Sequence, residues 1–483
     1  NVRKFYKKCG KSETIRYYDF TSLYPYVQKT KSFPIGHPTI IRQFEKYKGR
    51  ELLDFVKSSD FFGVAYVKVL PPKKLDMPVL PTKLGEQKTD KLIFSLCFKC
   101  AKIKSSKLCE CCDEDRALEG EYTSVELHKA IEKGYLILEV YEAHHFENKT
   151  NDENNYFKSY INRFLKIKTE ASGFPKELLK NKQKKKMSKT GLPVEKILTQ
   201  AQKERYIEEF WVREKIHLDI EKLNRGKNSG LRSLAKLMLN NLWGRLGIRD
   251  HFNGCKMFKR ENRNEYFEFI NQHGKSHIIA DTLQINSESI EVKYKSKQFS
   301  KKACLSNVYV ASFVSAYGRL QLFSAFEKIG KDLLYFDTDS VIFIDNLKNP
   351  KNIKTGLFLG DFTDELDGGM CSEYIGLMPK TYAYRYTDEN NNEKVAVKMK
   401  GFCLNYENAE KISIDCLKNL MNNPNEKVTF KNMKIGRDPK TKTLTHEEEV
   451  EKHFSFYYDK RIKTGNNTLP YGFGKELEVI MAH

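Results

Sequence analysis

Two short acidic segments lie about 320 residues apart in the chain, and each places carboxylates beside an expected strand. The first is Asp19-Phe-Thr-Ser-Leu-Tyr-Pro25, and the second is Tyr335-Phe-Asp-Thr-Asp-Ser340. Mg²⁺ prefers oxygen ligands, so carboxylates suit it better than histidine or cysteine does. Two carboxylate clusters that meet only after folding are what a two-metal site for phosphoryl transfer requires. For either segment alone, the alternative is a structural ion pair with lysine or arginine.

Residues 229–247, between the acidic segments, are expected to form a helix with a basic stripe. At 100° per residue, four side chains fall within about 80° of one another: Arg232, Lys236, Asn240 and Trp243. Most of the remaining surface is apolar, so this arc should pack on the domain while the stripe faces a cleft. The arc consists of Leu231, Leu234, Ala235, Leu237, Met238 and Leu242. Two cations without an acid suit a triphosphate, whereas a solvated helix surface is the alternative.

Hydrophobic patterning places the carboxylates at the ends of regular elements. Residues 14–20 alternate apolar and polar side chains, as a half-buried strand does, and the strand would deliver Asp19 to its end. Residues 308–329 are expected to form a largely apolar helix that leads into 333–344. There, two apolar strands flank Asp337-Thr338-Asp339, which predicts a hairpin with carboxylates at its tip. Carboxylates held at such a tip repel each other unless a cation lies between them.

The composition indicates a polyanionic partner and a reducing, intracellular compartment. The 483 residues include 84 Lys and Arg against 63 Asp and Glu, a net charge of +21. This excess favours nucleic acid first and an anionic membrane second, and a merely basic soluble protein is the alternative. Five of the eleven cysteines cluster between Cys97 and Cys112, a pattern that argues for a metal site rather than a disulfide scaffold. No run of about 18 apolar residues exists, so we expect neither a transmembrane helix nor a membrane partner. Asn1 is not an initiator methionine, so we expect an upstream segment.

The cysteine cluster reads Cys97-x-x-Cys100 and then Cys109-x-Cys111-Cys112. Four thiolates around a tetrahedral Zn²⁺ leave no open position, which makes such a site structural. The spacing offers four or five thiols within sixteen residues, from which the four ligands would come. Free buried thiols are the alternative.

The segments described above resemble the motifs of family B DNA polymerases, in the order of that family. Asp19 to Pro25 resembles motif A, and Tyr335 to Ser340 resembles motif C. Lys236-x-x-x-Asn240-Asn241-x-Trp243-Gly244 resembles motif B, which usually has Ser and Tyr where this chain has Asn241 and Trp243. Lys380-x-Tyr382 resembles the family's lysine–tyrosine motif at the primer terminus.

Finer features resemble the protein-primed branch of this family. Residues 156–172 and 229–247 look like its two fingers helices, and the long spacings on either side of motif B match its two insertions. Three phrases look most like polymerases of Maverick (Polinton) elements and related viruses: Leu239 to Arg245, Gly360 to Leu366, and Lys400-Gly401. In those elements the second cysteine pair is Cys-x-His, so Cys111 would replace the histidine.

The resemblance implies a role for each matching residue. Asp19 and Asp339 would bind two Mg²⁺ ions, with Mn²⁺ as a substitute, the Phe20 carbonyl as a further ligand and Asp337 in support. Nucleotide binding would involve Ser22, Leu23, Tyr24, Lys168, Arg232, Lys236 and Asn240, with the Tyr24 ring excluding a 2′-hydroxyl. Primer–template contacts would come from Asn241, Trp243, Gly244, Lys380, Tyr382 and Lys400. One structural Zn²⁺ would be held by Cys97, Cys100, Cys109 and Cys111, with Cys112 in reserve.

We therefore expect an α+β, right-hand fold of palm, fingers and thumb with an antiparallel palm sheet and two insertions. The expected ranges are palm 1–48 and 304–400, first insertion 49–152, fingers 153–250 with a basic excursion at 174–228, second insertion 251–303, and thumb 401–483. A 3′–5′ exonuclease domain normally precedes motif A, and only eighteen residues do so here. The chain is thus expected to be a polymerase domain only.

The implied function is DNA-directed DNA polymerisation by two-metal nucleotidyl transfer, in the replication of a mobile element or viral DNA. The expected partners are primer–template DNA, deoxynucleoside triphosphates and a terminal priming protein, and the chain is expected to act as a monomer. The host nucleus or a viral replication site would be its location. Two alternatives stay open: a degenerate element copy that only binds DNA, and another palm-type polymerase such as a reverse transcriptase.

Overall fold

The structure is a computed structural model in which residues 1–84, 91–175, 178, 198–248, 254–296, 306–388, 391–402, 405–438, 441 and 443–475 are described. The chain forms two compact units. The first comprises Asn1–Trp243, Tyr309–Lys398 and Tyr457–His483, and the second comprises Gly244–Val308 and Met399–Phe456. The run Lys184-Lys185-Lys186, within the expected basic excursion, lies outside the described residues.

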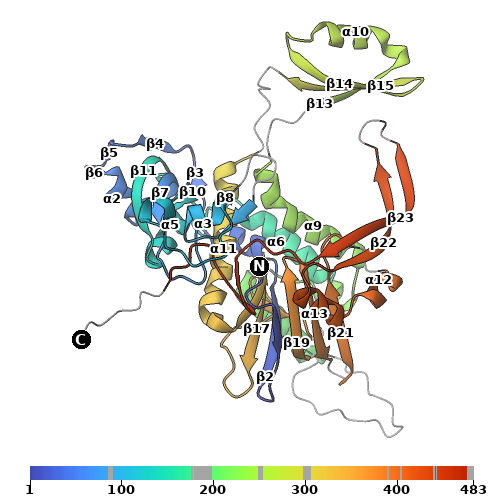
Figure 1. Cartoon of the computed structure of the whole chain (residues 1–483). Helices are drawn as coiled ribbons and strands as arrows, with labels where there is room; N and C mark the ends of the chain where they lie inside the picture. The colour runs from blue at the N-terminus through green and yellow to red at the C-terminus, as the bar shows by residue number, and fades with distance from the viewer. Residues whose placement is uncertain are drawn as a thin grey trace. The chain divides into compact units, whose positions relative to one another are not determined.

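An eight-stranded antiparallel sheet is the centre of the first unit. Its strand order is β16-β17-β2-β19-β20-β21, with β1 added to β19 and β18 added to β2 (Figure 1). The bounds are β1 (Tyr6–Lys8), β2 (Glu13–Phe20), β16 (Leu333–Asp337), β17 (Ser340–Asn346), β18 (Phe362–Asp364), β19 (Met370–Met378), β20 (Thr381–Thr387) and β21 (Glu393–Lys398). The two acidic segments of the sequence therefore meet on neighbouring strands, although they are far apart along the chain.

Helix α11 (Val308–Ile329) carries a run of buried apolar side chains and packs against this sheet. The Phe326 ring lies 4.6 Å from that of Phe336 on β16. Further along α11, Gly318 lies against α1 (Leu23–Thr30), since a Cβ atom there would come within 3.2 Å of the Tyr24 ring. The apolar helix predicted at 308–329 is present, and its buried face supports the strands that carry the acidic segments.

Four helices contain the expected fingers segments. They are α6 (Lys158–Glu170), α7 (Gln200–Glu214), α8 (Ile220–Asn224) and α9 (Ser229–Leu246). The expectation that the apolar arc of α9 packs on the domain was wrong in part, because only Ala235 and Leu239 are buried. Leu231, Leu234 and Leu237 are 45–55 % exposed. The helix is held along a narrow face, where the Tyr160 hydroxyl donates to the Met238 carbonyl at 3.1 Å.

A second sheet, of order β10-β7-β11-β4, occupies the first-insertion range and takes β4 from just before it. Two helices accompany it, α2 (Leu52–Lys57) and α5 (Ser124–Glu132). The strands are β4 (Thr39–Arg42), β7 (Gly63–Leu70), β10 (Leu118–Thr123) and β11 (Leu136–His145). Smaller pieces are β3 (Pro34–Ile35) with β12 (Asn148–Lys149), β5 (Lys46–Tyr47) with β6 (Arg50–Glu51), β8 (Thr82–Leu84) with β9 (Lys91–Ile93), α3 (Phe98–Lys102) and α4 (Asp113–Arg116).

The chain returns to the first unit at Tyr457, forms the hairpin of β24 (Ile462–Thr464) and β25 (Asn467–Leu469), and continues to residue 475, the last described. The second unit contains a three-stranded sheet, β13-β15-β14, and a long hairpin. Its elements are β13 (Gly254–Lys259), α10 (Arg263–Asn271), β14 (His277–Asn286), β15 (Ser289–Ser296), α12 (Tyr406–Lys411), α13 (Ile414–Asn422), β22 (Lys427–Arg437) and β23 (Leu444–Ser455). Across the described part of both units, no helix combines the length and the apolar character that crossing a membrane requires.

Candidate active site

The register of three strands brings the acidic residues together. Asp19, near the end of β2, stands opposite Ser340 at the start of β17, and Asp337 at the end of β16 also pairs with Ser340. Asp339 lies in the tight turn between β16 and β17, and its carbonyl accepts a hydrogen bond of 2.8 Å from the Phe20 amide. Asp19, Asp337 and Asp339 therefore meet at one end of three neighbouring strands of the central sheet.

The environment of Asp19 and Asp339 disfavours charge in the absence of a cation. Burial, then the neighbouring charges of Asp339 and Glu365, raise the pKa of Asp19 to about 7, while Lys236 acts in the opposite direction. Burial, followed by Asp337, also raises the pKa of Asp339. Among the described residues, neither carboxylate forms an ion pair with lysine or arginine, so the structural-ion-pair alternative does not apply to them. Hard oxygen donors under mutual repulsion fit divalent metal ions such as Mg²⁺.

Asp337 is engaged differently, because most of its partners come from its own turn. The Thr338 amide and hydroxyl donate to its Oδ1 at 3.0 and 3.2 Å. Lys380 Nζ lies 3.7 Å from Oδ2, and the Tyr335 hydroxyl lies 3.5 Å from the same oxygen. These contacts are consistent with a carboxylate that shapes the turn.

The lysine–tyrosine segment lies beside this hairpin. The Lys380 amide donates to the Tyr335 hydroxyl at 2.8 Å, and the Tyr382 ring lies 4.9 Å from the Tyr335 ring. The hydroxyl of Tyr382 also shares a hydrogen bond of 3.0 Å with that of Tyr17 on β2. Lys380 and Tyr382 are therefore close to the carboxylates in space.

Cations from α6 and α9 gather near the turn that follows β2. Lys168 Nζ donates to Ser22 Oγ at 2.9 Å, and Arg232 Nε donates to Ser172 Oγ at 3.1 Å. Burial, together with the charges of Arg232 and Lys236, lowers the pKa of Lys168 to about 8. The repulsion that Lys168 experiences from Arg232 and Lys236 is relieved when a polyanion binds near the three cations.

Tyr24 is fixed between two elements. Its ring lies 4.5 Å from that of Trp243, and Gly318 of α11 leaves the space that the ring edge occupies. Leu23, beside it, is fully buried, so its side chain belongs to the core. Asn240 and Asn241 are exposed on α9, and Gly244 and Lys400 belong to the second unit.

One carboxylate near this site was missed by sequence reasoning. Glu365 follows β18, and its amide donates to the Tyr17 carbonyl at 2.9 Å, so its charge contributes to the raised pKa of Asp19. Burial raises its own pKa as well. The sequence from Gly360 to Leu366, which contains Glu365, resembles Maverick-type polymerases, but that resemblance assigns no role to Glu365. Its return to β2 depends on sheet register, which spacing alone does not encode.

The cysteine cluster is a separate candidate metal centre. The sulfur atoms of Cys97, Cys100, Cys109 and Cys111 all lie within 4.8 Å of one another. Cys112, the reserve candidate for a zinc ligand, is exposed and does not belong to this group. Burial raises the pKa of the Cys97 thiol to about 12 without metal. Four soft donors gathered in this way fit a tetrahedral Zn²⁺.

The segment from Tyr457 onwards clamps this cysteine loop. The Leu96 amide donates to the Tyr471 carbonyl at 2.7 Å, and the Cys109 amide donates to the Phe473 carbonyl at 2.8 Å. A side chain at Gly472 would collide with Cys97, which lies within 2.4 Å of a Cβ placed there. Metal binding by the cysteines would therefore also hold this C-terminal segment.

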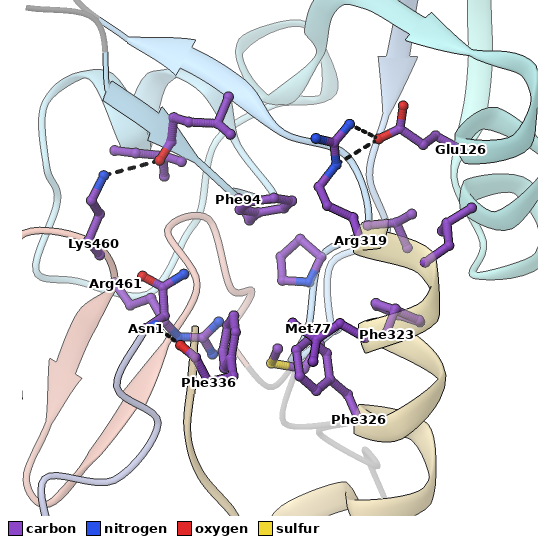
Figure 2. Close-up of a pocket in the computed structure, with 16 residues that line it drawn as sticks. Asn1, Met77, Phe94, Glu126, Arg319, Phe323, Phe326, Phe336, Lys460 and Arg461 are labelled. Atoms are coloured by element: carbon purple, nitrogen blue, oxygen red, sulfur yellow. Dashed lines mark hydrogen bonds and ion pairs between the residues drawn. The ribbon is translucent and has the colours of Figure 1, made fainter. Parts of the chain in front are cut away.

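An apolar pocket of about 80 Å³ lies elsewhere in the first unit and contains none of the metal-site carboxylates. Figure 2 shows its aromatic walls, which include Phe323, Phe326 and Phe336. At its rim, Arg319 donates twice to one oxygen of Glu126, at 3.0 and 2.6 Å. Asp19, Asp337 and Asp339 do not line this pocket and remain the candidate site.

Comparison with known proteins agrees with the polymerase resemblance. Residues 2–192 match the family model described as DNA polymerase type B, organellar and viral. A probable DNA polymerase of Neurospora intermedia is 24 % identical over 407 residues, covering 83 % of this chain and 32 % of that protein. One of Podospora anserina is 25 % identical over 415 residues, covering 83 % of this chain and 27 % of that protein. The chain therefore spans about a third or less of these relatives.

Solved structures of Phi29 DNA polymerase share the fold at 14 % sequence identity. The orthorhombic crystal form aligns with a TM-score of 0.53 over 94 % of this chain and 59 % of that one. A complex with primer–template DNA and incoming nucleotide substrates aligns with a TM-score of 0.52 over 94 % and 61 %. The expected α+β fold with an antiparallel central sheet is confirmed.

Proposed function

We propose that this chain belongs to the family B DNA polymerases of the organellar and viral type, and that it transfers deoxynucleoside monophosphates to a primer 3′-hydroxyl under the direction of a DNA template. The observation that carries the proposal is the meeting of Asp19, near the end of β2, with Asp339 in the β16–β17 turn, with no ion-pair partner for either among the described residues. A cluster of three cations, Lys168, Arg232 and Lys236, supports it.

Asp19, Asp339 and the Phe20 carbonyl would hold two Mg²⁺ ions, and Asp337 would keep the turn in shape. When bound, the ions would lower the pKa of the primer hydroxyl and stabilise the pyrophosphate leaving group. Lys168, Arg232 and Lys236 would bind the triphosphate. A buried lysine with a pKa near 8 is mostly protonated at pH 7 and loses its charge as the pH rises through 8, so an arriving triphosphate would stabilise the charged form of Lys168.

Tyr24 would pack under the deoxyribose and leave no space for a 2′-hydroxyl. Its ring is held by Trp243 and backed by α11 at Gly318, so it has little freedom to move aside. Lys380 and Tyr382 would contact the primer terminus, which supports a position for the 3′-hydroxyl near the β16–β17 turn. Asn241, Trp243, Gly244 and Lys400 would contribute further primer–template contacts.

We also propose protein priming, with a terminal protein as partner, and origin from a Maverick-type element or related virus. The motif phrases and the two insertions support this narrower assignment. The palm, insertion, fingers and thumb ranges given above belong to the same proposal, as does monomeric action in the nucleus or at a viral replication site. The cysteine cluster would hold one structural Zn²⁺ that ties the first insertion to the C-terminal segment. A DNA-binding copy without activity is disfavoured because all three aspartates are present.

Primer extension in Mg²⁺ tests the proposal. Wild-type protein should extend a labelled primer, whereas Asp339→Asn should reduce extension by a factor of about 1,000 or more while duplex affinity stays within twofold. Asp152→Asn is the matched control, because the Asp152 side chain is highly exposed and pairs with Lys158 rather than with any residue of the candidate site. Near-normal turnover by Asp339→Asn would disprove the metal assignment. No extension by wild-type protein on any primer would count against the activity itself.

A further inference from the structure

Helix α7 ends in two charged residues that both reach the loop at residues 358–361. The two terminal nitrogens of the Arg213 guanidinium, Nη1 and Nη2, donate to different carboxylate oxygens of Asp361, each at 2.8 Å. This two-point contact fixes orientation as well as distance. The Asp361 side chain is only 7 % exposed. The guanidinium also lies 4.3 Å from the centre of the Phe358 ring, so the pair is packed as well as hydrogen-bonded.

Glu214 attaches the same helix end at two further points. One of its carboxylate oxygens accepts from the Leu359 amide at 3.0 Å, and the other accepts from Lys29 Nζ at 2.8 Å. Lys29 also donates to the Glu214 carbonyl at 2.7 Å, and both side chains are buried. Since Lys29 belongs to α1, the end of α7 holds both the loop and the helix that carries Tyr24.

The loop in turn holds the backbone directly after β2. The Thr21 amide donates to the Asp361 carbonyl at 2.9 Å, and the Gly360 amide donates to the Thr21 carbonyl at 3.0 Å. Gly360 has a φ of 80°, and a Cβ there would lie 2.3 Å from the Tyr26 ring. The approach of the loop to α1 therefore requires glycine.

The turn held in this way is itself strained. Ser22 has φ 57° and ψ 61°, a left-handed conformation that is uncommon for residues other than glycine and that the surroundings must enforce. Its hydroxyl is the group that receives the hydrogen bond from Lys168. A change in the loop would thus alter both the backbone of the turn and the position of a triphosphate-binding cation.

We propose that Arg213 and Asp361 are positioning residues that set the Thr21–Ser22 turn for the incoming triphosphate. The path runs from the end of α7 through the Asp361 carboxylate and carbonyl to the Thr21 amide, and then to Ser22 and Lys168. It rests on the proposed function, because the turn receives a nucleotide only if the chain polymerises them. Nucleotide affinity would then depend on a helix end almost 200 residues from Asp19 in the sequence.

Single-nucleotide extension on one primer–template separates this role from a general loss of stability. Arg213→Gln and Asp361→Asn should each raise the KM for the deoxynucleotide about tenfold, with duplex affinity within twofold of wild type. Arg213→Lys, which keeps the charge but loses the two-point contact, should fall between wild type and Arg213→Gln. The double variant should be no worse than either single variant, because both act through one contact. Arg205→Gln is the control on the same helix, since its bond to Glu209 is exposed.

The positioning role is wrong if Arg213→Gln keeps a wild-type KM, or if the two single effects multiply in the double variant. Hydrogen exchange provides a readout that needs no activity: the Thr21 amide should exchange faster in Arg213→Gln and in Arg213→Lys than in Arg205→Gln. Unchanged exchange at Thr21 would overturn the proposal whether or not the protein extends primers. Absence of extension by the wild type, with faster Thr21 exchange in Arg213→Gln, would count against the polymerase function and leave the mechanical link standing.

Discussion

Replacing Asp19 by asparagine should stabilise the metal-free protein while it abolishes extension. The fold raises the pKa of Asp19 from an ordinary 3.8 to about 7. Between these two values the native protein binds more protons than the unfolded chain, so the free energy of unfolding falls as pH rises. At pH 8 the full cost of holding this charge is present, and asparagine removes it.

The size of the effect follows from the shift. A difference of about 3 pKa units corresponds to about 4 kcal/mol at 1.36 kcal/mol per unit. The side chain is partly exposed and the neighbouring carboxylates share the repulsion, so solvent screening reduces this upper bound to about 1–2 kcal/mol. At pH 5 the carboxyl group is protonated in the native state but ionised in the unfolded chain, so about 1.2 of the roughly 3 pKa units still apply. The advantage of asparagine should therefore fall to somewhat more than a third of its value at pH 8.

Thermal melts measure this difference in stability. The proteins compared are wild type, Asp19→Asn and the exposed control Asp152→Asn, each with EDTA or with Mg²⁺, at pH 5 and at pH 8. We expect Asp19→Asn to melt above wild type at pH 8 in EDTA, and we expect Mg²⁺ to raise the melting temperature of wild type and of the control but not of Asp19→Asn. Equal melting of Asp19→Asn and wild type in EDTA at pH 8 would refute the reasoning about repulsion. An undiminished Mg²⁺ response in Asp19→Asn would refute the metal assignment.

Three further predictions concern the sugar barrier, the two phosphate-binding lysines and the cysteine cluster. Tyr24→Ala should admit ribonucleotides far more readily, because the ring is the proposed barrier; an unchanged ratio of ribo- to deoxynucleotide extension would place the barrier elsewhere. Lys236→Ala should raise the KM for deoxynucleotides and slow chemistry, whereas Lys380→Ala should mainly weaken primer-terminus binding. Each lost charged contact should cost about 1.5–3 kcal/mol. Identical kinetics of the two variants in a nucleotide titration would contradict these assignments. Purified protein should contain about one zinc ion per chain. Cys97→Ser or chelation should speed proteolysis of the cysteine loop and of the C-terminal segment before extension is lost. Zinc-free protein in which every thiol of the cluster can be titrated would exclude the site.

Much of the site followed from local pattern. The alternation of residues 14–20 and the apolar flanks of Asp337-Thr338-Asp339 predicted strand ends bearing carboxylates, and the structure has strands and a turn there. The periodicity of residues 229–247 predicted a helix, which is α9. The spacing of the cysteines predicted a cluster, and four sulfur atoms lie together. Each of these depends on neighbours within a few residues, which is the range over which backbone periodicity acts.

Other features were decided only by contacts between distant segments. Glu365 comes close to Asp19 because β18 pairs with β2. Asp361 contacts Arg213, which lies on α7 and precedes it by 148 residues in the sequence. Helical periodicity identified the apolar arc of α9 but not which of its leucines would be covered, since that depends on the neighbouring helices. The sequence by itself determined which residues carry carboxylates, cations and thiols and which strands and helices bear them. The tertiary structure decided which of these groups meet, because strand register and helix docking depend on the packing of the whole unit rather than on local spacing.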